Sequence, residues 1–368
     1  MEIALVDLGI QYQNIKSEID QAIADTLAQT AFIGGSRVSQ FEQEFAQYLG
    51  DNHVISCGNG TDSLEILLEV FGVGEGDEVL VPALSWISTS EVVATRGATP
   101  VFVDVDPATY VIDPAQMEAK ITSRTRAIIP VHLYGHPADM PKIMEIAQKH
   151  DLKVIEDCAQ AHGAKINDKL IGTWGHAASF SFFPSKNLGC FGDGGAMVVP
   201  DEHLADQARM IARHGQKTRH DHRVHGRNSR LDALQAAILS VKLPHLENWT
   251  ELRIQHAQRY RELLSEVEEV HTPTTHSDCR HVFHVYVIRA SKRDALKDYL
   301  AEHGVQSVVH YPVALPFQPC YDDLNIREED FPIARQYQDE VLSLPMYPEL
   351  TEEAIRKVTD TVKQFYAR

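Results

Sequence analysis

One lysine stands between an apolar, aromatic segment and a glycine-rich loop. Residues 179–189 read Ser-Phe-Ser-Phe-Phe-Pro-Ser-Lys-Asn-Leu-Gly, and Gly-Asp-Gly-Gly follows at residues 192–195. A lysine that is partly withdrawn from water has a lowered pKa and becomes a usable amine nucleophile. Lys186 is therefore a candidate catalytic residue. The alternative, a lysine on the surface of a hairpin, is disfavoured by the apolar surroundings.

Asp157 stands at the end of the apolar run Val154–Glu156, within the segment Lys-Val-Ile-Glu-Asp-Cys-Ala-Gln-Ala-His-Gly of residues 153–163. Ligands of parallel sheets gather beyond the carboxyl ends of the strands, so this carboxylate is placed to hold a cationic ring nitrogen. The alternative is an acid that only caps the next helix, which is common.

The turn of residues 57–63 reads Cys-Gly-Asn-Gly-Thr-Asp-Ser and lies between an expected strand and an expected helix. Its glycines allow a close approach of the backbone to a ligand, and Thr61 or Asp62 is expected to cap the helix. The free N–H groups and the helix dipole favour an anion, typically a phosphate. The turn matches neither a P-loop nor GxGxxG, so an ordinary strand-to-helix turn stays open as an alternative.

Together these three features supply what pyridoxal phosphate requires: a phosphate site, an anion beside its pyridinium nitrogen and a lysine for a Schiff base. Trp86 follows another apolar run, in Pro-Ala-Leu-Ser-Trp. It is placed to stack on the ring, although a single tryptophan more often belongs to the core.

The elements that position these residues alternate between short apolar runs and helical patterns. The runs, rich in Val and Ile, are Val54–Ser56, Glu78–Val81, Val101–Val105, Ala127–Val131 and Val154–Glu156. In residues 63–71 and again in 231–241, apolar side chains recur at helical spacing on one face. The sequence therefore predicts an α/β fold with a mostly parallel sheet covered by helices on both faces.

The pattern changes near residue 245, after Pro244, which is expected to stop or bend a helix. Beyond it we expect a helix over Leu246–Glu266, a strand over Val282–Ile288, a helix over Lys292–His303, a strand over Val305–Val309 and a helix over Glu352–Tyr366. We predict a large domain over residues 1–245, whose N-terminal segment contacts a smaller α+β domain over residues 246–368.

Composition excludes several classes of function. The chain has 34 Lys and Arg against 52 Asp and Glu, a net charge of −18, which argues against nucleic acid or an anionic membrane as the main partner. The N-terminus does not resemble a signal peptide, and no apolar run approaches the ~18 residues of a membrane span, so a cytoplasmic protein is expected. The five cysteines form no CxxC pair and predict neither a disulfide framework nor a metal site.

The segment from Arg209 to Arg230 is strongly basic, with seven Lys or Arg and one acid, Asp221. Such a segment suits a nucleotide diphosphate, with or without a sugar carboxylate. The alternative is a solvated loop, or one paired with acids of a partner subunit. Arg230 is the best candidate of this group to reach the active site.

The order of these motifs strongly resembles the DegT/StrS family of nucleotide-sugar aminotransferases. Gly-Asn-Gly-Thr-Asp, Glu-Asp-Cys-Ala-Gln-Ala-His-Gly, Ser-Phe-Phe-Pro-Ser-Lys-Asn-Leu-Gly and Gly-Asp-Gly-Gly-Ala follow one another, and residues 227–232 and 310–312 match further family segments. The resemblance covers nearly the whole chain. It implies a type I aminotransferase fold that acts as a homodimer with pyridoxal 5'-phosphate.

The resemblance also implies roles for single residues. Lys186 is similar to the lysine that binds the cofactor covalently, Asp157 to the partner of the pyridine nitrogen, and Gln160 to a contact of the ring hydroxyl. Trp86 matches the stacking aromatic residue. The phosphate contacts implied are Gly60, Thr61, Ser181 and, from the partner subunit, Asn228. His310 and Tyr311 resemble a turn that contacts the sugar, beside Arg230.

The implied reaction transfers the amino group of L-glutamate to a keto group of a nucleotide-linked sugar, with Lys186 as the base. The Phe-Phe-Pro-Ser-Lys and Arg-His-Gly-Gln segments are most similar to members that aminate C3 of a UDP-2-acetamido-3-oxo-hexuronate, a step toward cell-surface polysaccharides such as lipopolysaccharide O-antigen. A 4-keto- or 3-keto-6-deoxy sugar on dTDP, UDP or GDP is the alternative substrate.

Two other classes of protein are alternatives to an aminotransferase. An NAD-dependent oxidoreductase shares the α/β pattern, but no GxGxxG follows the first strand. A non-catalytic regulator on the same fold is expected to have lost Lys186 or Asp157, and both are present. Family dehydratases carry a histidine at position 186, so the lysine favours amino transfer.

Overall fold

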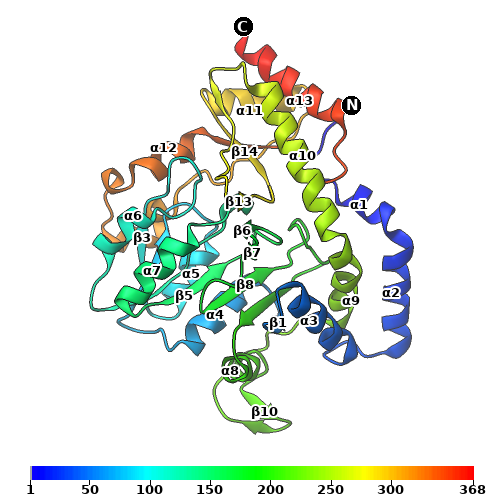
Figure 1. Ribbon diagram of the computed structural model, residues 1–368, viewed down its shortest axis with the longest axis vertical. Coiled ribbons are helices and arrows are strands. Elements are labelled where there is room, and N and C mark those ends of the chain that lie inside the picture. Colours follow the sequence, from blue (N-terminus) through cyan, green and yellow to red (C-terminus); the bar gives the residue numbers. More distant parts are fainter. Residues whose placement is uncertain (1) are drawn as a thin grey trace.

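The computed structural model describes residues 2–368. Its centre is a seven-stranded sheet in the order β1-β9-β8-β5-β4-β2-β3 (Figure 1). The strands are β1 (His53–Cys57), β2 (Glu78–Pro82), β3 (Thr99–Val103), β4 (Thr125–Ile128), β5 (Lys153–Asp157), β8 (Ala177–Ser181) and β9 (Gly195–Val199). Neighbours are parallel except where β9 pairs with β1 and with β8. The predicted α/β class with a mostly parallel sheet is confirmed.

Helices cover both faces of this sheet and close two separate cores. Along β5, Val154 packs into one core and Ile155 into the other, because successive side chains of a strand point to opposite faces. One core contains side chains of α3 (Ser36–Tyr48), α7 (Met140–His150) and α9 (Ala233–Lys242). The other contains side chains of α4 (Gly60–Val70), α5 (Ser88–Thr95) and α8 (Glu202–Ala212).

The C-terminal part forms a third core around an antiparallel sheet in the order β12-β14-β15. Its strands are β12 (Val270–His271), β14 (Tyr286–Ala290) and β15 (Val341–Leu344), and the helices packed into this core are α10 (Leu246–Leu264), α11 (Arg293–Glu302) and α13 (Glu352–Tyr366). The helix α12 (Pro332–Glu340) lies in the same part of the chain, but its Tyr337 and Ala334 pack into the two cores of the large sheet. Ile3, near the N-terminus, pairs with Val305 and packs into this core. The domain boundary at residue 245 stays a prediction.

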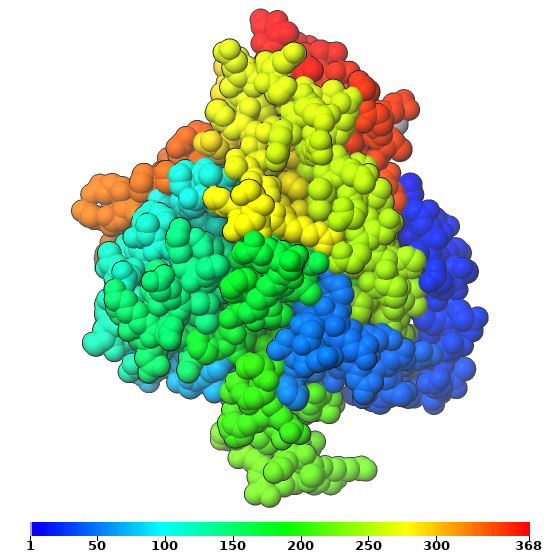
Figure 2. Space-filling view, viewed as in Figure 1, coloured from blue at the N-terminus to red at the C-terminus, as the bar shows by residue number. Residues whose placement is uncertain are grey.

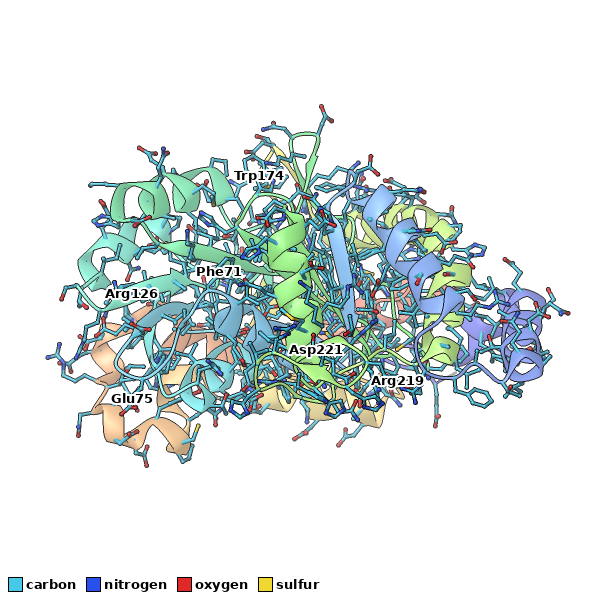
Figure 3. All side chains as sticks on the ribbon, turned by 90° about the horizontal axis from the view of Figure 1, so that it is seen from below. Phe71, Glu75, Arg126, Trp174, Arg219 and Asp221 are labelled. Atoms are coloured by element: carbon cyan, nitrogen blue, oxygen red, sulfur yellow. The ribbon has the colours of Figure 1, made fainter. Side chains whose placement is uncertain are left out.

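Shorter elements complete the chain. They are α1 (Leu8–Asn14), α2 (Lys16–Gln29), α6 (Pro114–Met117), the strands β6 (Lys165–Ile166), β7 (Lys169–Leu170) and β13 (Cys279–Arg280), the hairpin β10 (Gln216–Thr218) and β11 (Asp221–His222), and, within residues 2–368, six 3-10 turns. The hairpin projects from one end of the molecule (Figures 1 and 2). Figure 3 looks at that end and labels Arg219 and Asp221 on the hairpin. No helix among residues 2–368 is long and apolar enough to cross a membrane.

Pro244 lies in a 3-10 turn, Leu243–His245, that interrupts the helical run between α9 and α10, in agreement with the expected stop or bend. Two other details differ from the sequence-based expectations. The predicted strand over residues 305–309 is wrong: Val305 pairs with Ile3 and Val308 with Ser343, and two isolated bridges to different partners make no ladder. The strand predicted from residue 282 begins only at Tyr286, because the preceding residues bind a loop that lines the site described below.

Candidate active site

A cavity of about 340 Å³ opens where the carboxyl ends of β1, β2, β4, β5 and β8 meet. Chain segments that are far apart in the sequence converge there because parallel strands end at one edge of a sheet. Nine predicted site residues line it: Gly60, Thr61, Trp86, Asp157, Gln160, Ser181, Lys186, His310 and Tyr311. The structure thus brings these residues together, and the role of each stays a prediction.

Lys186 reaches this cavity from the loop that follows β8. Its backbone N–H donates to the carbonyl of Phe183 over 2.8 Å, which closes a tight turn around the lysine. Burial lowers the pKa of the Lys186 amine to about 8, and the opposite charge of Asp157 limits this fall. About a tenth of the amine is therefore unprotonated at pH 7, far more than in an ordinary lysine, which makes it a usable nucleophile or base.

Asp157, the last residue of β5, is only 6% exposed. Its Oδ1 accepts from the N–H of Ala159 and its Oδ2 from Oγ1 of Thr89, each over 3.1 Å. Burial raises the pKa of Asp157, while these hydrogen bonds and the charge of Lys186 oppose the rise. A cationic group beside the carboxylate would therefore stabilise its ionised form.

The neighbouring residue, Glu156, fixes the end of β5 from the opposite face. Its two oxygens accept hydrogen bonds of 2.7–2.9 Å from three backbone N–H groups of the turn at residues 172–175, and one from Nε2 of His132 over 3.1 Å. The side chains of Glu156, His132 and Cys158 lie close enough to one another to hold a metal ion. Because the carboxylate already has four donors, we interpret this group as structural.

The N-terminus of α4 forms one end of the cavity. Its cap is the Asn59 side chain, which accepts from the N–H of Asp62 over 2.8 Å, so the expectation of Thr61 or Asp62 as the cap is wrong. The first N–H groups of a helix have no acceptor within the helix, and those of Gly60 and Thr61 remain for an anion. A Cβ on Gly60 would lie 2.8 Å from that of Ser181, so only glycine allows this approach.

Gln160 and Tyr311 form a second wall. The Gln160 side chain accepts from the N–H of Tyr134 over 2.7 Å and donates to the hydroxyl of Tyr311 over 3.1 Å. The Tyr311 ring lies 5.8 Å from that of Trp86, which is 57% exposed and thus not a core residue. Trp86 therefore has ring surface free to stack on a planar ligand.

His310 lies beside this wall. Its Nδ1 is 2.8 Å from Oγ of Ser343, and its backbone carbonyl accepts from the hydroxyl of Tyr134. Burial lowers the pKa of His310 to about 4, and the charge of Lys186 contributes. His310 is therefore a neutral group at physiological pH.

Asn228 and Arg230 do not reach the cavity of their own chain. Arg227, which precedes Asn228, forms ion pairs with Glu65 and Glu69. Ser229, which lies between Asn228 and Arg230, donates a hydrogen bond to Asp62 over 2.6 Å. Residues 227 and 229 thus point inward, whereas Asn228 and Arg230 are exposed. Arg230 instead lines a separate hollow of about 220 Å³ together with Arg213.

Sequence reasoning missed several residues that shape the cavity. Thr89 does not line the cavity but binds Asp157, which does, and it stands three residues after Trp86; Tyr134 lines the cavity and follows β4. The rule that ligands gather beyond strand ends offered a signal for both. His284 offered no such signal, because the sequence placed it inside a strand. Ser85, Ser88 and Phe183 also line the cavity.

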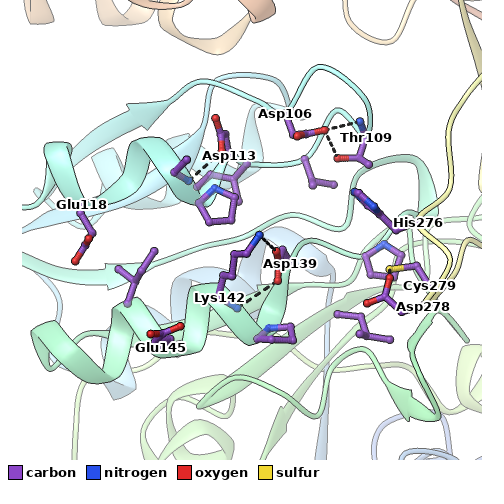
Figure 4. A pocket seen from close by; sticks show the side chains of 18 of the residues that line it. Asp106, Thr109, Asp113, Glu118, Asp139, Lys142, Glu145, His276, Asp278 and Cys279 are labelled. Atoms are coloured by element: carbon purple, nitrogen blue, oxygen red, sulfur yellow. Dashed lines mark hydrogen bonds and ion pairs between the residues drawn. The ribbon is translucent and has the colours of Figure 1, made fainter.

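A second hollow, of about 560 Å³, lies between α6, α7 and the segment of residues 276–279 (Figure 4). It is lined by several carboxylates, and three of them, Asp106, Asp113 and Asp139, already have structural partners. Asp113 caps α6, while Asp139 caps α7 and pairs with Lys142. Asp106 accepts three hydrogen bonds from its own turn. The hollow contains no amine poised like Lys186, so the first cavity is the candidate active site.

The groups around the first cavity fit pyridoxal phosphate. The free N–H groups of α4 suit its phosphate, the carboxylate of Asp157 suits its ring nitrogen, and the amine of Lys186 suits its aldehyde. The amine and the carboxylate lie close enough for each to shift the pKa of the other, as one ligand between them requires.

Comparison with known proteins agrees with this chemistry. Residues 13–363 match the model of the DegT/DnrJ/EryC1/StrS aminotransferase family. A pleiotropic regulatory protein of Geobacillus stearothermophilus is 48% identical over 100% of this chain and 99% of its own length. UDP-2-acetamido-2-deoxy-3-oxo-D-glucuronate aminotransferase of Pseudomonas aeruginosa is 43% identical over 96% and 98%.

A solved structure shares the whole fold. The crystal structure of S. venezuelae DesV in complex with a ketimine intermediate superposes with a TM-score of 0.97 and 39% identity, covering 100% of this chain and 99% of that one. The type I aminotransferase fold is therefore confirmed. The chain belongs to the DegT/DnrJ/EryC1/StrS aminotransferase family and is a pyridoxal phosphate-dependent aminotransferase.

Proposed function

We propose that this enzyme transfers the amino group of L-glutamate to C3 of a UDP-2-acetamido-3-oxo-hexuronate, for cell-surface polysaccharide biosynthesis. One observation carries the catalytic part: the Lys186 amine, with its pKa lowered to about 8, shares one cavity with the buried carboxylate of Asp157. The substrate class is supported by the similarity to the P. aeruginosa aminotransferase of a 3-oxo-glucuronate.

The residues of the chain divide the work by their chemistry. Bound pyridoxal phosphate supplies an electron sink for the carbanion formed at the carbon that carries the amino group. Lys186 binds the cofactor covalently and, when free, accepts the proton from that carbon. Asp157 keeps the ring nitrogen protonated, since an ionised carboxylate stabilises a neighbouring cation. Gln160 and Trp86 hold the ring in place.

A nucleotide diphosphate or a sugar carboxylate requires cations without internal partners. Within the basic segment, Arg209 pairs with Glu42, Arg223 with Asp221, and Arg227 with Glu65 and Glu69. Arg213 and Arg230 line the small hollow without an ion pair to acids among the described residues. Burial and the charges of Arg209 and Arg230 lower the pKa of Arg213, so an anion there would be stabilised.

The active sites are proposed to be shared between two copies of the chain. Asn228 and Arg230 are exposed although their neighbours are fixed inward, which leaves both side chains free to reach a partner subunit. Large apolar side chains are also exposed: Leu8, Ile10, Leu27, Phe32, Ile33, Phe183, Phe191 and Val224. Burial of such side chains favours a symmetric dimer.

The experiment that tests the proposal incubates the holoenzyme with L-glutamate and a panel of keto-sugar nucleotides, and follows the release of 2-oxoglutarate. We expect release to become catalytic with the UDP-linked 3-oxo-hexuronate. Catalytic release only with a 4-keto- or 3-keto-6-deoxy sugar would assign the alternative substrate. No release even of one equivalent would favour a regulatory role, which the name of the G. stearothermophilus relative suggests for that protein.

A further inference from the structure

One buried hydroxyl joins two segments that lie far apart in the sequence. Ser229 is 1% exposed, and its Oγ accepts a hydrogen bond from the N–H of Gly58 over 3.0 Å. The same Oγ donates a hydrogen bond to Oδ2 of Asp62 over 2.6 Å, which uses the single hydrogen of the hydroxyl. The reaction proposed above assigns no role to this residue.

The two groups that Ser229 binds stand at the ends of residues 58–62, here called the phosphate turn because it is proposed to hold the cofactor phosphate. The three residues between these ends line the cavity. A Cβ on Gly58 would lie 3.3 Å from Oγ of Ser229 and 3.7 Å from its Cα, so the two backbones approach closely. The hydroxyl of Ser229 therefore bridges the two ends of the phosphate turn.

The backbone around Ser229 is held as well. The N–H of Ser229 donates to the carbonyl of Ala212, the last residue of α8, over 3.0 Å. Arg227 forms ion pairs with Glu65 and Glu69 of α4 over 2.7 and 3.0 Å. Both acids lie on the same face of α4 as the carboxylate that Ser229 binds, because the three positions are spaced three and four residues apart. The segment of residues 227–229 is thus fixed to the helix that begins in the phosphate turn.

Asn228 and Arg230 stand on either side of Ser229, and both are exposed. We propose that Ser229 is a positioning residue for two active sites of a dimer: its hydroxyl holds the phosphate turn of its own chain, and its fixed backbone sets where Asn228 reaches the site of the partner subunit. The proposal rests on the proposed sharing of active sites between two copies of the chain. Without the hydroxyl, a backbone N–H and a carboxylate lose their partner, and both segments become free to shift.

Dimers assembled from two differently tagged full-length chains test this proposal. One chain carries Lys186→Ala, so borohydride traps pyridoxal phosphate only on Lys186 of the other chain. Trapping at increasing cofactor concentration then gives the Kd of that one cavity. Asn228→Asp in the lysine-free chain is measured first, and a large rise in Kd is expected if the cavity is shared. An unchanged Kd would contradict the proposed sharing, and the proposal about Ser229 would fall with it.

Ser229→Ala is then placed in one chain at a time. In the lysine-free chain it acts on the intact cavity through the segment that carries Asn228, and in the other chain it acts through the phosphate turn. We expect each placement to raise the Kd about fivefold, because each removes the hydrogen bonds of the same hydroxyl.

Thr359→Val in α13 is the matched control. Its hydroxyl is buried, donates to the carbonyl of Arg356 over 3.0 Å and does not line the cavity. The control should leave the Kd unchanged in either chain. A rise equal to that of Ser229→Ala would overturn the proposal, since the loss of any buried hydroxyl would then have the same effect.

A rise from only one placement of Ser229→Ala, or from neither, would also overturn the proposal, because Ser229 would then serve a single site or none. If Asn228→Asp does raise the Kd, this outcome leaves the shared site intact and refutes the role of Ser229 alone. If the chain with Ser229→Ala does not fold, as judged by circular dichroism, Ser229→Cys replaces it. The thiol is a weaker donor and acceptor, so a smaller rise is expected from both placements, and no rise would again overturn the proposal.

Discussion

Oγ1 of Thr89 donates a hydrogen bond to Oδ2 of Asp157, and this bond links α5 to the end of β5 at the floor of the cavity. The Thr89 hydroxyl has only one hydrogen, and this bond uses it. Oγ1 of Thr89 therefore accepts a hydrogen bond from Oγ of Ser85, which lies 2.9 Å away. Together with the N–H of Ala159, which binds Oδ1, this chain of hydroxyl groups fixes the plane of the carboxylate.

Thr89→Val removes the donor while keeping the shape of the side chain. Oδ2 of Asp157 then lacks a protein donor at this position, which favours the neutral carboxylic acid and leaves the ring nitrogen less protonated. We expect kcat to fall by about tenfold or more, since a hydrogen bond to a charged group contributes about 1.5–3 kcal/mol. Steady-state kinetics with saturating cofactor measures this loss.

Thr89→Ser is the matched control, because it restores the hydroxyl and lacks only a methyl group. Its kcat should return to within a few-fold of wild type. Wild-type kcat in Thr89→Val would show that the hydrogen bond to Asp157 does not matter here, and a loss confined to Thr89→Ser would indicate that packing of the methyl group matters instead.

The lowered pKa of Lys186 has a consequence for stability. In the protein without cofactor, the pKa of Lys186 is about 8 in the folded state and returns to its ordinary value of 10.5 in the unfolded chain. Below pH 8 the unfolded state therefore binds the proton more tightly, and the folded state is destabilised. The penalty disappears as the pH rises from about 8 to 10.5. Lys186→Met removes the charge and should stabilise the cofactor-free protein by about 3 kcal/mol at pH 7.

Urea denaturation of both proteins across this pH range measures the difference. The stability of the wild type should approach that of Lys186→Met as the pH rises, because the unfolded lysine also becomes neutral. A difference that does not change with pH would indicate that methionine packs better and that burial of the charge is not the cause.

Gly60 tests the phosphate end of the cavity. Gly60→Ala places a Cβ 2.8 Å from Cβ of Ser181, closer than atoms of this kind approach, so the N-terminus of α4 or Ser181 must move. Overpacking of this kind costs about 1–3 kcal/mol, and we expect the Kd for pyridoxal phosphate to rise by about tenfold. Titration of the cofactor-free protein, followed by the visible absorption of the bound cofactor, measures it.

Gly74→Ala is the control for this prediction. The Cβ that it adds meets no atom closer than the carbonyl of Arg96 at 3.7 Å, an ordinary contact distance, and Gly74 does not line the cavity. This variant should bind the cofactor as the wild type does. Wild-type affinity in Gly60→Ala would contradict the proposed phosphate site.

The residues that local pattern identifies are those at the ends of regular elements. Asp157 ends a buried strand, Lys186 follows the next strand of the sheet, and Gly60 opens a helix, so each could be placed from the sequence and from the rule for parallel sheets. Tyr134 lies in a turn with a left-handed φ of 59°, and its contacts with Gln160 depend on how two loops cross. No local pattern encodes such a crossing.

The segment before β14 shows why a local pattern can mislead. Residues 282–288 read Val-Phe-His-Val-Tyr-Val-Ile, whose β-rich composition predicts one continuous strand. The structure places Phe283 in the left-handed region at φ 44°, and Val282 and His284 bind the backbone of Gly135 and Tyr134. Tertiary hydrogen bonds therefore override the strand preference and turn His284 toward the cavity, a result that single-sequence reasoning cannot supply.

Asn228 can show whether the active site is formed by two subunits or by one chain alone. Its side chain is exposed and does not line the cavity of its own chain, so any contact with the cofactor phosphate must come from a second subunit. Asn228→Asp places a negative charge at that contact, and we expect the variant to lose cofactor binding and activity. Lys186→Ala should be inactive for a different reason, the loss of the amine.

Mixing the two inactive variants after unfolding and refolding them together tests whether the site is shared. In a mixed dimer, one site combines both substitutions, whereas the other combines an intact Lys186 with an intact Asn228 from the partner chain. Random pairing with twofold symmetry restores about a quarter of the sites, so about a quarter of wild-type activity should return. Separately refolded variants provide the baseline. If activity stays at that baseline although mixed dimers form, Asn228 does not act across the interface.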